Sequence, residues 1–204
     1  MKVFDTQCKQ YDAWYDAHKY AFLSELAALR KVIPRDEKGL EIGVGTGRFA
    51  AELGISMGID SSHAMLKQAS ARGVNVRWGV GEDIYFLNET FDFVAIITTL
   101  CFVENVRKVL EESARVLKKR GHIIIGIIDK ESFLGKSYRK KKSIFYRHAH
   151  LFTIQEVTAL LKKAGFRAFS YYQTITKLPE KMIAVEKPKK GFGKGGFVVV
   201  SAKK

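Results

Sequence analysis

Residues 39–50, GLEIGVGTGRFA, constrain the fold more than any other stretch of the sequence. An apolar run that contains one acid leads into three glycines at alternate positions, and helix-forming residues follow directly. A chain needs little or no side chain where its backbone turns between a strand and a helix and approaches a ligand closely. The stretch therefore predicts a strand, a ligand-binding turn and a helix in direct succession.

The rest of the first 129 residues repeats this alternation of strands and helices. Apolar runs predict strands at 55–60, 74–79, 91–99 and 121–129, and helical spacing predicts helices between them, as well as one at 11–30. The run FDFVAIITT at 91–99 is almost wholly apolar, as expected for a strand that helices cover on both faces. The alternation predicts a doubly wound, Rossmann-like α/β fold with a mostly parallel sheet.

The regular alternation of strands and helices ends after residue 129. A helix is predicted from Thr153, which forms a capping box with Glu156, to Gly165, and two closing strands follow it, the last antiparallel. The fold class is then a seven-stranded sheet with helices on both faces. We expect one domain over 1–204, made of a helical cap at 1–35, a ligand-binding core at 36–129, an irregular basic cap segment at 130–152, and a C-terminal helix with closing strands at 153–204.

The net charge of +14 is placed unevenly, because residues 129–204 hold 18 Lys and Arg against 5 Asp and Glu. This asymmetry favours a solvated basic surface, and a polyanion-binding face is the alternative. The N-terminus has no apolar signal core, the two cysteines have no metal-like spacing, and the longest apolar runs fall short of the roughly 18 residues of a membrane helix. We therefore expect a cytoplasmic protein with reduced thiols and no membrane partner.

Two interpretations of the glycines compete. From Gly45, GTGRFA matches the dinucleotide pattern G-x-G-x-x-A, and from Gly43, EIGVGTG matches acid-x-G-x-G-x-G. Glu41 favours the second interpretation, because a carboxylate inside a strand is costly unless it binds something, and it attracts a sulfonium or ammonium group while it repels phosphate. Asp60 ends the next strand and can accept both hydroxyls of a ribose. The pattern favours a positively charged adenosine derivative over NAD.

Four motifs then resemble one family in the right order: LEIGVGTGRFA, GIDSSHAML, GVGEDIYF, and FDFVAIITTLCFVEN with ARVLKKRGHIII. The chain is similar to class I S-adenosylmethionine-dependent methyltransferases of the type 11, small-molecule kind, over about residues 36–130. It departs from the family where Tyr85 replaces a proline, Gly81 an alanine, and Lys119–Arg120 a Pro-Gly pair.

The resemblance implies that S-adenosyl-L-methionine is the methyl donor and S-adenosyl-L-homocysteine the product. The glycine turn would receive the methionine part, Asp60 the ribose and the 81–83 segment the adenine. Separately from the resemblance, Tyr11 and Tyr15 lie one helical turn apart and can face the cationic donor, with core packing as the commoner explanation of such a stripe. Packing is the alternative role for Met65, and helix capping beside Ser62 is the alternative for Asp60. The predicted donor-binding residues are Glu41, Gly43, Gly45, Gly47, Asp60, Ser61, Met65, Gly81, Glu82, Asp83, Thr98 and Tyr15.

The sequence constrains the identity of the methyl acceptor less than that of the donor. Displacement on an activated methyl group depends mainly on alignment, so a general base is optional. His148, His150 and Tyr11 are candidate catalytic residues, and since the histidines lack a third partner we predict no metal. Cys101 follows Leu100 where a nucleophilic cysteine would follow proline, so it is interpreted as a small buried side chain.

The predicted function is methyl transfer to oxygen, nitrogen or carbon of a small-molecule acceptor by in-line displacement. One alternative is an RNA-modifying methyltransferase that uses the basic C-terminal third, including YRKKK at 138–142. The same glycines also allow an NAD-dependent oxidoreductase, or a protein that binds the donor without catalysis. The acceptor and the oligomeric state stay open.

Overall fold

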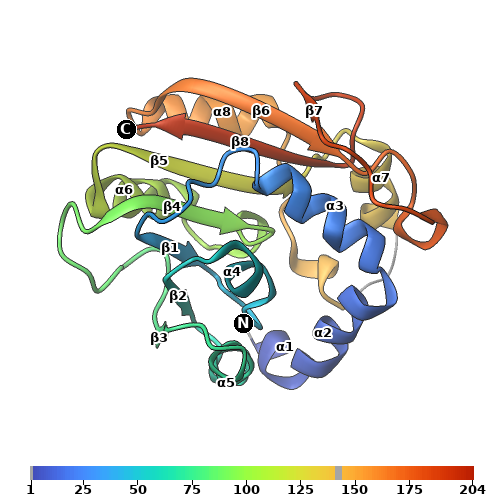
Figure 1. Cartoon of the computed structure of the whole chain (residues 1–204), viewed down its shortest axis with the longest axis horizontal. Helices are drawn as coiled ribbons and strands as arrows, with labels where there is room; N and C mark the ends of the chain where they lie inside the picture. The colour runs from blue at the N-terminus through green and yellow to red at the C-terminus, as the bar shows by residue number, and fades with distance from the viewer. Residues whose placement is uncertain (1, 141–143) are drawn as a thin grey trace.

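The computed structural model describes residues 2–140 and 144–204, apart from the side chains of Lys2 and His148, and in this part of the chain eight strands form one sheet (Figure 1). The strands follow the alternation that the sequence predicts. Their order across the sheet is β3 (Val76–Trp78), β2 (Met57–Asp60), β1 (Gly39–Ile42), β4 (Phe91–Ile97), β5 (Leu117–Ile128), β8 (Phe197–Lys203), β6 (Arg167–Thr174) and β7 (Lys189–Lys190).

The sheet is mostly parallel and Rossmann-like, as predicted. Strands β3, β2, β1, β4 and β5 pair in parallel, and β8 lies antiparallel between β5 and β6. The predicted count of seven strands is one too low, because Lys189 and Lys190 pair with Gln173 and Tyr172 as a short antiparallel strand. Two residues in a lysine-rich connection are too few to show strand alternation in the sequence.

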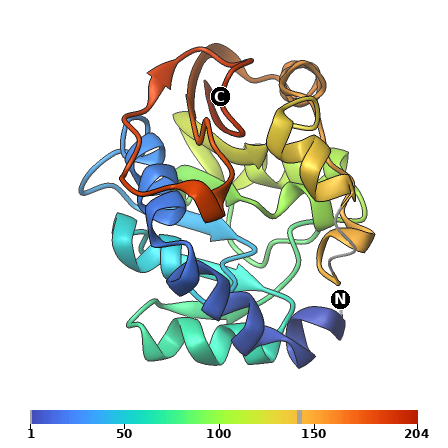
Figure 2. The same ribbon diagram turned by 90° about the vertical axis from the view of Figure 1, so that its right-hand side faces the viewer.

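Helices cover both faces of the sheet (Figures 1 and 2). Leu26 of α3, Phe49 of α4 and Leu66 of α5 belong to the apolar core on one face, and Leu110 of α6 and Val157 of α8 belong to the core on the other. No helix in the described ranges has the length and apolar character needed to cross a bilayer. The α-helices are α1 (Lys2–Thr6), α2 (Cys8–Ala17), α3 (Lys19–Leu29), α4 (Arg48–Leu53), α5 (His63–Ala71), α6 (Val106–Val116), α7 (Phe133–Lys140) and α8 (Ile154–Lys163), with 3₁₀ helices η1 (Leu100–Phe102), η2 (Tyr146–His148) and η3 (Pro179–Lys181).

The helix predicted over 11–30 is divided at His18. The backbone of His18 leaves the helical region, with φ −121° and ψ 44°, and its N–H donates to the Trp14 carbonyl at 3.0 Å. The His18 ring stacks on the Trp14 ring with centroids 4.5 Å apart. The break lets α2 run across the end of the sheet while α3 packs along its face (Figure 1).

Two boundaries also differ from the sequence prediction. The segment 130–152, expected to be irregular, contains α7, whose start is stabilised by the Gly135 N–H donating to Ser132 Oγ at 3.0 Å. The helix predicted between the strands at 91–99 and 121–129 ends at Val116, and the strand begins earlier than predicted, because Leu117 already pairs with Phe91 as the first residue of β5. Short helices with many basic residues carry little apolar periodicity, so no clear pattern indicates α7.

Candidate active site

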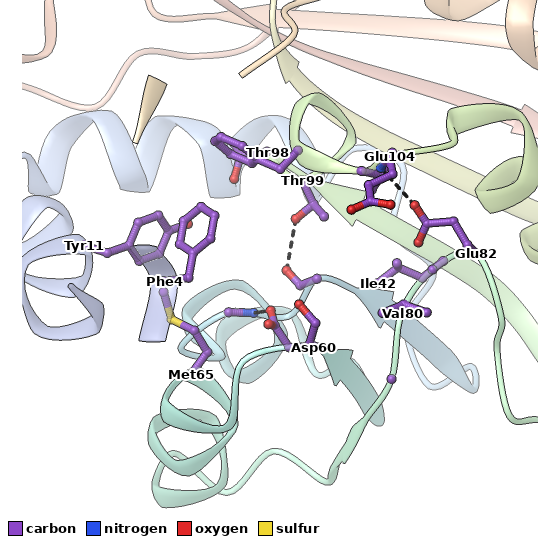
Figure 3. Close-up of a pocket in the computed structure, with 17 residues that line it drawn as sticks. Phe4, Tyr11, Ile42, Asp60, Met65, Val80, Glu82, Thr98, Thr99 and Glu104 are labelled. Carbon is purple, nitrogen blue, oxygen red and sulfur yellow. Dashed lines mark hydrogen bonds between the residues drawn. The ribbon is translucent and has the colours of Figure 1, made fainter. Parts of the chain in front are cut away.

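A cavity of about 480 Å³ opens at the carboxyl ends of the parallel strands β1, β2 and β4 (Figure 3). This is the edge at which ligands bind in doubly wound sheets. It is formed by the glycine turn after β1, the end of β2, the loop after β3, the end of β4 and the first two helices. The lining residues are Phe4, Tyr11, Ile42, Gly43, Gly45, Asp60, Ser61, Met65, Gly79, Val80, Gly81, Glu82, Thr98, Thr99, Phe102, Val103 and Glu104.

The glycine turn presents backbone to the cavity. Gly43 has φ +69°, and a Cβ atom there would collide with the Thr99 side chain, whose hydroxyl donates to the Gly43 carbonyl at 3.1 Å. Gly45 has φ +53° and more open surroundings, with Tyr11 the nearest contact of an added Cβ at 3.9 Å. Gly47 does not line the cavity: it is buried against Ala69, which allows α4 and α5 to pack closely.

Asp60 is held in place by two backbone amides. The Gly45 N–H donates to Oδ2 at 2.9 Å (Figure 3), and the Ser62 N–H donates to Oδ1, also at 2.9 Å. Burial raises the pKa of Asp60 above its ordinary value, although both amide bonds oppose the rise. The residue that caps α5 is Ser62, whose hydroxyl accepts from the Met65 N–H, so Asp60 is not the helix cap. Its carboxylate is therefore fixed at the cavity wall.

Glu41 lies beneath the glycine turn and outside the cavity lining. Its side chain is 1% exposed, and no group in the described residues bonds its Oε2 atom. Burial, followed by the nearby Asp60 carboxylate, raises the pKa of Glu41 well above its ordinary value. It points to the face that α4 covers, since its strand neighbours Leu40 and Ile42 belong to the core on the other face. A direct contact between Glu41 and the donor stays a prediction.

The loop after β3 forms the opposite wall. Gly81 and Glu82 line it, and a Cβ atom on Gly81 would meet Ile42 at 2.8 Å. Glu82 accepts the Glu104 N–H at 3.0 Å, which ties this loop to the segment before α6 (Figure 3). Asp83 is exposed and does not line the cavity, because Ile84 rather than Asp83 turns toward the core.

On the β2 side, Ser61 and Met65 line the cavity as the sequence predicts. Met65 is 1% exposed, and the Cys8 thiol lies 3.5 Å from its sulfur, so it both packs in the core and borders the cavity. Thr98 lines the cavity from the end of β4 with φ +52°, a rare conformation for threonine, and its N–H donates to the Gly126 carbonyl at 2.8 Å. Such backbone strain is typical of functional sites.

Aromatic side chains from separate segments gather at the cavity, and we call Phe4, Tyr11, Phe102 and Phe145 the aromatic cover. The first three line the cavity, and Phe145 packs against Phe4 and Tyr11. The Phe4 ring lies 5.8 Å from Tyr11, 5.1 Å from Phe102 and 5.8 Å from Phe145, between ring centroids. Burial raises the pKa of Tyr11 to about 12, and its hydroxyl bonds both Tyr15 and Thr98. Tyr15 lies behind Tyr11 and does not line the cavity. No sequence pattern indicates Phe4, because α1 has five residues and no apolar period.

Acidic residues on the first two helices bind them to the glycine turn. Asp12 accepts hydrogen bonds from Thr46 at 2.6 Å, Arg48 at 2.7 Å and Arg72 at 2.7 Å. On α1, Asp5 accepts from the Ser62 hydroxyl at 2.6 Å. These bonds hold the aromatic cover over the cavity, and sequence reasoning missed both acids, which resemble any exposed helix residue.

His150, one of the two histidine candidates, does not line the cavity. Its side chain is exposed, its ring packs on Phe152 with centroids 4.6 Å apart, and its backbone N–H donates to the Cys101 carbonyl. The His148 side chain is not among the described ones. Burial raises the pKa of Cys101 to about 12, which keeps its thiol protonated and agrees with a packing role.

The basic stretch 138–142 is only partly a solvated loop. Tyr138 is buried on α7, and Arg139 donates to the Lys130 carbonyl and lies 3.9 Å from a Glu131 carboxylate oxygen. Lys141 and Lys142 lie outside the described residues.

Comparison with known proteins identifies the family. Residues 40–125 match a family model described as a methyltransferase domain. The chain is 48% identical to an uncharacterized protein of Methanocaldococcus jannaschii over the full length of both. It is 42% identical, with a TM-score of 0.97, to the crystal structure of an S-adenosylmethionine-dependent methyltransferase of Thermotoga maritima, covering 100% of this chain and 99% of that one. It is also 30% identical to a demethylmenaquinone methyltransferase of Alkalihalophilus pseudofirmus, over 60% of this chain and 59% of that protein.

The chain therefore belongs to the class I S-adenosylmethionine-dependent methyltransferases, and S-adenosylmethionine is its methyl donor. The cavity fits this group. Gly43 and Gly81 line it with bare backbone at positions where a Cβ atom would collide with Thr99 or Ile42, and Asp60 offers two fixed oxygens suited to a pair of ribose hydroxyls. The donor, when bound, supplies a methyl group activated by a positively charged sulfur. The chain's part is to bind the donor, orient it and exclude water.

Proposed function

We propose that the chain transfers the methyl group to a small-molecule acceptor by in-line displacement, with proximity and orientation supplying most of the rate. The observation that carries this proposal is the aromatic cover, because three of its members, Phe4, Tyr11 and Phe102, line the same cavity as Thr98, the end that we call the reaction end. A second cavity of about 20 Å³ is also lined by Thr98, together with Cys101 and Tyr146. A concave site lined by aromatic side chains suits a small molecule.

The names of two relatives support a small acceptor. The Thermotoga maritima protein is described as a possible histamine N-methyltransferase, and the Alkalihalophilus pseudofirmus relative is a demethylmenaquinone methyltransferase. The first of these covers nearly the whole of the present chain, including the segments that form the aromatic cover.

The residues around the reaction end act by positioning. The strained Thr98 backbone and its bond to Tyr11 fix the end of β4 against α2. Tyr11 stays a neutral phenol near neutral pH, so it offers an aromatic face and a hydroxyl rather than a negative charge. Alignment in a water-poor chamber can supply a large part of the acceleration of a displacement reaction without a general base.

The proposal is tested by incubating the protein with methyl-labelled S-adenosylmethionine and cell extract, followed by separation of small molecules from macromolecules. We expect protein-dependent label in the small-molecule fraction and its loss in Asp60→Ala. Label that accumulates in RNA or protein instead would overturn the small-molecule acceptor and favour the basic surface as a binding face. A parallel measurement of salt-dependent retention of bulk tRNA separates these outcomes.

A further inference from the structure

Glu25, on α3, is a buried acid that has no role in the function proposed above. Its side chain is 3% exposed, and no hydrogen-bond donor in the described residues reaches its Oε2 atom. Burial alone raises its pKa to about 8. A carboxyl group in such surroundings destabilises the fold when it ionises, unless a cation or several donors accompany it.

Two other acids of this chain with little exposure, Glu112 and Asp12, have basic partners. Glu112, which is 7% exposed, bonds Arg115 at 2.8 Å and accepts the Ile84 N–H at 2.9 Å. Asp12 forms ion pairs with Arg48 and Arg72, both at 2.7 Å. None of the ion pairs found among the described residues includes Glu25. The partner of Glu25 is thus not supplied by the described part of the chain.

Four tyrosines lie within electrostatic range of this acid, and we call Tyr11, Tyr15, Tyr138 and Tyr146 the tyrosine cluster. Burial raises the pKa of each of them, and the negative charge of Glu25 adds to the rise at all four, which places all of them within electrostatic reach of its carboxyl group. The Tyr11 and Tyr15 hydroxyls are 3.0 Å apart, and the Tyr138 and Tyr146 rings are 4.4 Å apart between centroids. All four pack in or against the apolar core that also contains the α3 residues next to Glu25.

The tyrosine cluster also reaches the reaction end of the active site. Tyr11 lines the main cavity, and Tyr146 lines the second cavity of about 20 Å³. Thr98 lines both cavities, so both border the end of β4. Glu25 lines neither cavity, but two tyrosines of the cluster near it, Tyr11 and Tyr146, each line one of them.

We propose that the methyl acceptor is an organic amine, and that the Glu25 carboxylate binds its ammonium group beside the tyrosine cluster and then takes one proton from it. The nitrogen lone pair forms the N–C bond as the bond between the methyl carbon and the donor sulfur breaks, which leaves S-adenosylhomocysteine and an N-methylated ammonium, while Glu25 holds the first proton. This inference rests on the proposed small-molecule function and adds the chemical class of the acceptor. An ammonium group supplies the positive charge that a buried carboxylate lacks, and the faces of tyrosine rings attract it as well. A carboxylate or phosphate acceptor would be repelled by ionised Glu25, and a neutral alcohol brings no charge that favours its ionisation. Because the second cavity holds about one water molecule, Tyr146 must move aside when an amine enters.

The test uses the full chain saturated with S-adenosylhomocysteine. Thermal shift and calorimetry compare three amines (2-phenylethylamine, histamine and putrescine) with the neutral 2-phenylethanol and the acidic phenylacetate. We expect saturable binding of at least one amine, no binding of the alcohol or the acid, and about a tenfold or greater loss of amine affinity in Glu25→Gln. The matched control is Glu52→Gln, because the Glu52 side chain is 54% exposed and its loss should leave amine affinity unchanged.

Affinity for S-adenosylhomocysteine provides the folding control, and it should be the same in Glu25→Gln as in the unchanged chain. If Glu25→Gln does not fold, Tyr146→Leu is the second variant, with an expected loss of amine affinity of about fivefold. Absence of binding by all three amines, equal binding by Glu25→Gln, or equal binding of 2-phenylethanol would each overturn the inference. Glu25-dependent amine binding together with label in the macromolecular fraction would instead overturn the proposed function and leave the amine site in place.

Discussion

The two sides of the active site are built by different parts of the chain. On the donor side, the carboxyl ends of β1 and β2 bring together the Gly43 and Gly45 backbone and Asp60, whose carboxylate is fixed by two amides. On the acceptor side, side chains such as Phe4 and Glu25 come from helices outside the sheet. The donor side is thus set by backbone geometry that the parallel sheet imposes. The acceptor side depends on how separate helices dock, and it can change without disturbing the sheet.

Each side also has one buried acid with an oxygen unpartnered in the described residues, Glu41 beneath the glycine turn and Glu25 within the tyrosine cluster. Both have raised pKa values because of burial. The donor is itself a cation, so an acid near its binding turn is expected for this family. By the same physical argument, the second acid supports the proposal that the acceptor is an amine that enters the site as a cation.

The largest effect is expected from a side chain added to the glycine turn. In Gly43→Ala, the positive φ and the collision with Thr99 should abolish detectable binding of S-adenosylmethionine in calorimetry, a loss of about 100-fold or more. Gly45→Ala has a similar φ but open space, so it should cost about tenfold or less. Equal losses in both variants would mean that backbone strain alone, and not the contact with Thr99, limits the turn.

Removing the fixed carboxylate of the donor side is the next largest change. Asp60→Ala should weaken S-adenosylmethionine binding by about 10- to 100-fold, because hydrogen bonds to a charged group are worth about 1.5–3 kcal/mol. Asp83→Ala is the matched control, since Asp83 is exposed and outside the cavity lining. A comparable loss of affinity in Asp83→Ala would show that Asp83 contributes to adenine binding, as the sequence motif predicts.

The sequence predicts the donor side well and the acceptor side poorly, for a physical reason. Gly43, Gly45 and Asp60 follow strands whose ends must meet at one edge, so their spacing predicts their position. Glu25 falls on the apolar stripe of its helix near Leu26, and an acid there looks the same in sequence whether it borders solvent or a buried chamber. Phe4 stands in a helix too short for any period. Side-chain chambers made by docked helices depend on long-range packing, which local patterns do not report.

A pH titration of stability distinguishes the two buried acids. Folding raises the pKa of Glu25 from 4.5 to about 8, so the folded chain holds this proton more tightly than the unfolded chain. The contribution of Glu25 to the free energy of unfolding is fully present below about pH 4.5. Between about pH 4.5 and pH 8 it falls by about 1.4 kcal/mol for each pH unit. Urea unfolding of the ligand-free chain and of Glu25→Gln at intervals from pH 5 to pH 8 should show a flatter slope in the variant.

Glu41 and Asp60 also have raised pKa values, but they titrate in both proteins and cancel in the difference between the slopes. Parallel slopes would show that Glu25 has a partner or solvent access in the ligand-free chain. That result would remove the reason to assign a cation to it.

The smallest effect concerns the bonds that join the two sides. Asp12 joins α2, the helix that contains Tyr11, to the glycine turn. Burial raises the pKa of Asp12, but hydrogen bonds from Arg48, Thr46 and Arg72 outweigh burial and lower this pKa to about 2. This stabilisation is present above about pH 4 and is lost as the pH falls through about 2. Asp12→Asn should therefore reduce the free energy of unfolding at pH 7 by about 1 kcal/mol.

Asp16 is the control on the same helix, because it also pairs with Arg48, at 2.8 Å, but its side chain is 69% exposed. Asp16→Asn should change stability by less than about 0.5 kcal/mol, as exposed ion pairs usually do. If the docking of α2 serves mainly the acceptor side, Asp12→Asn should weaken amine binding more than it weakens S-adenosylhomocysteine binding in calorimetry. Equal weakening of both ligands would show that the glycine turn itself depends on Asp12, and that the two sides of the site are one mechanical unit.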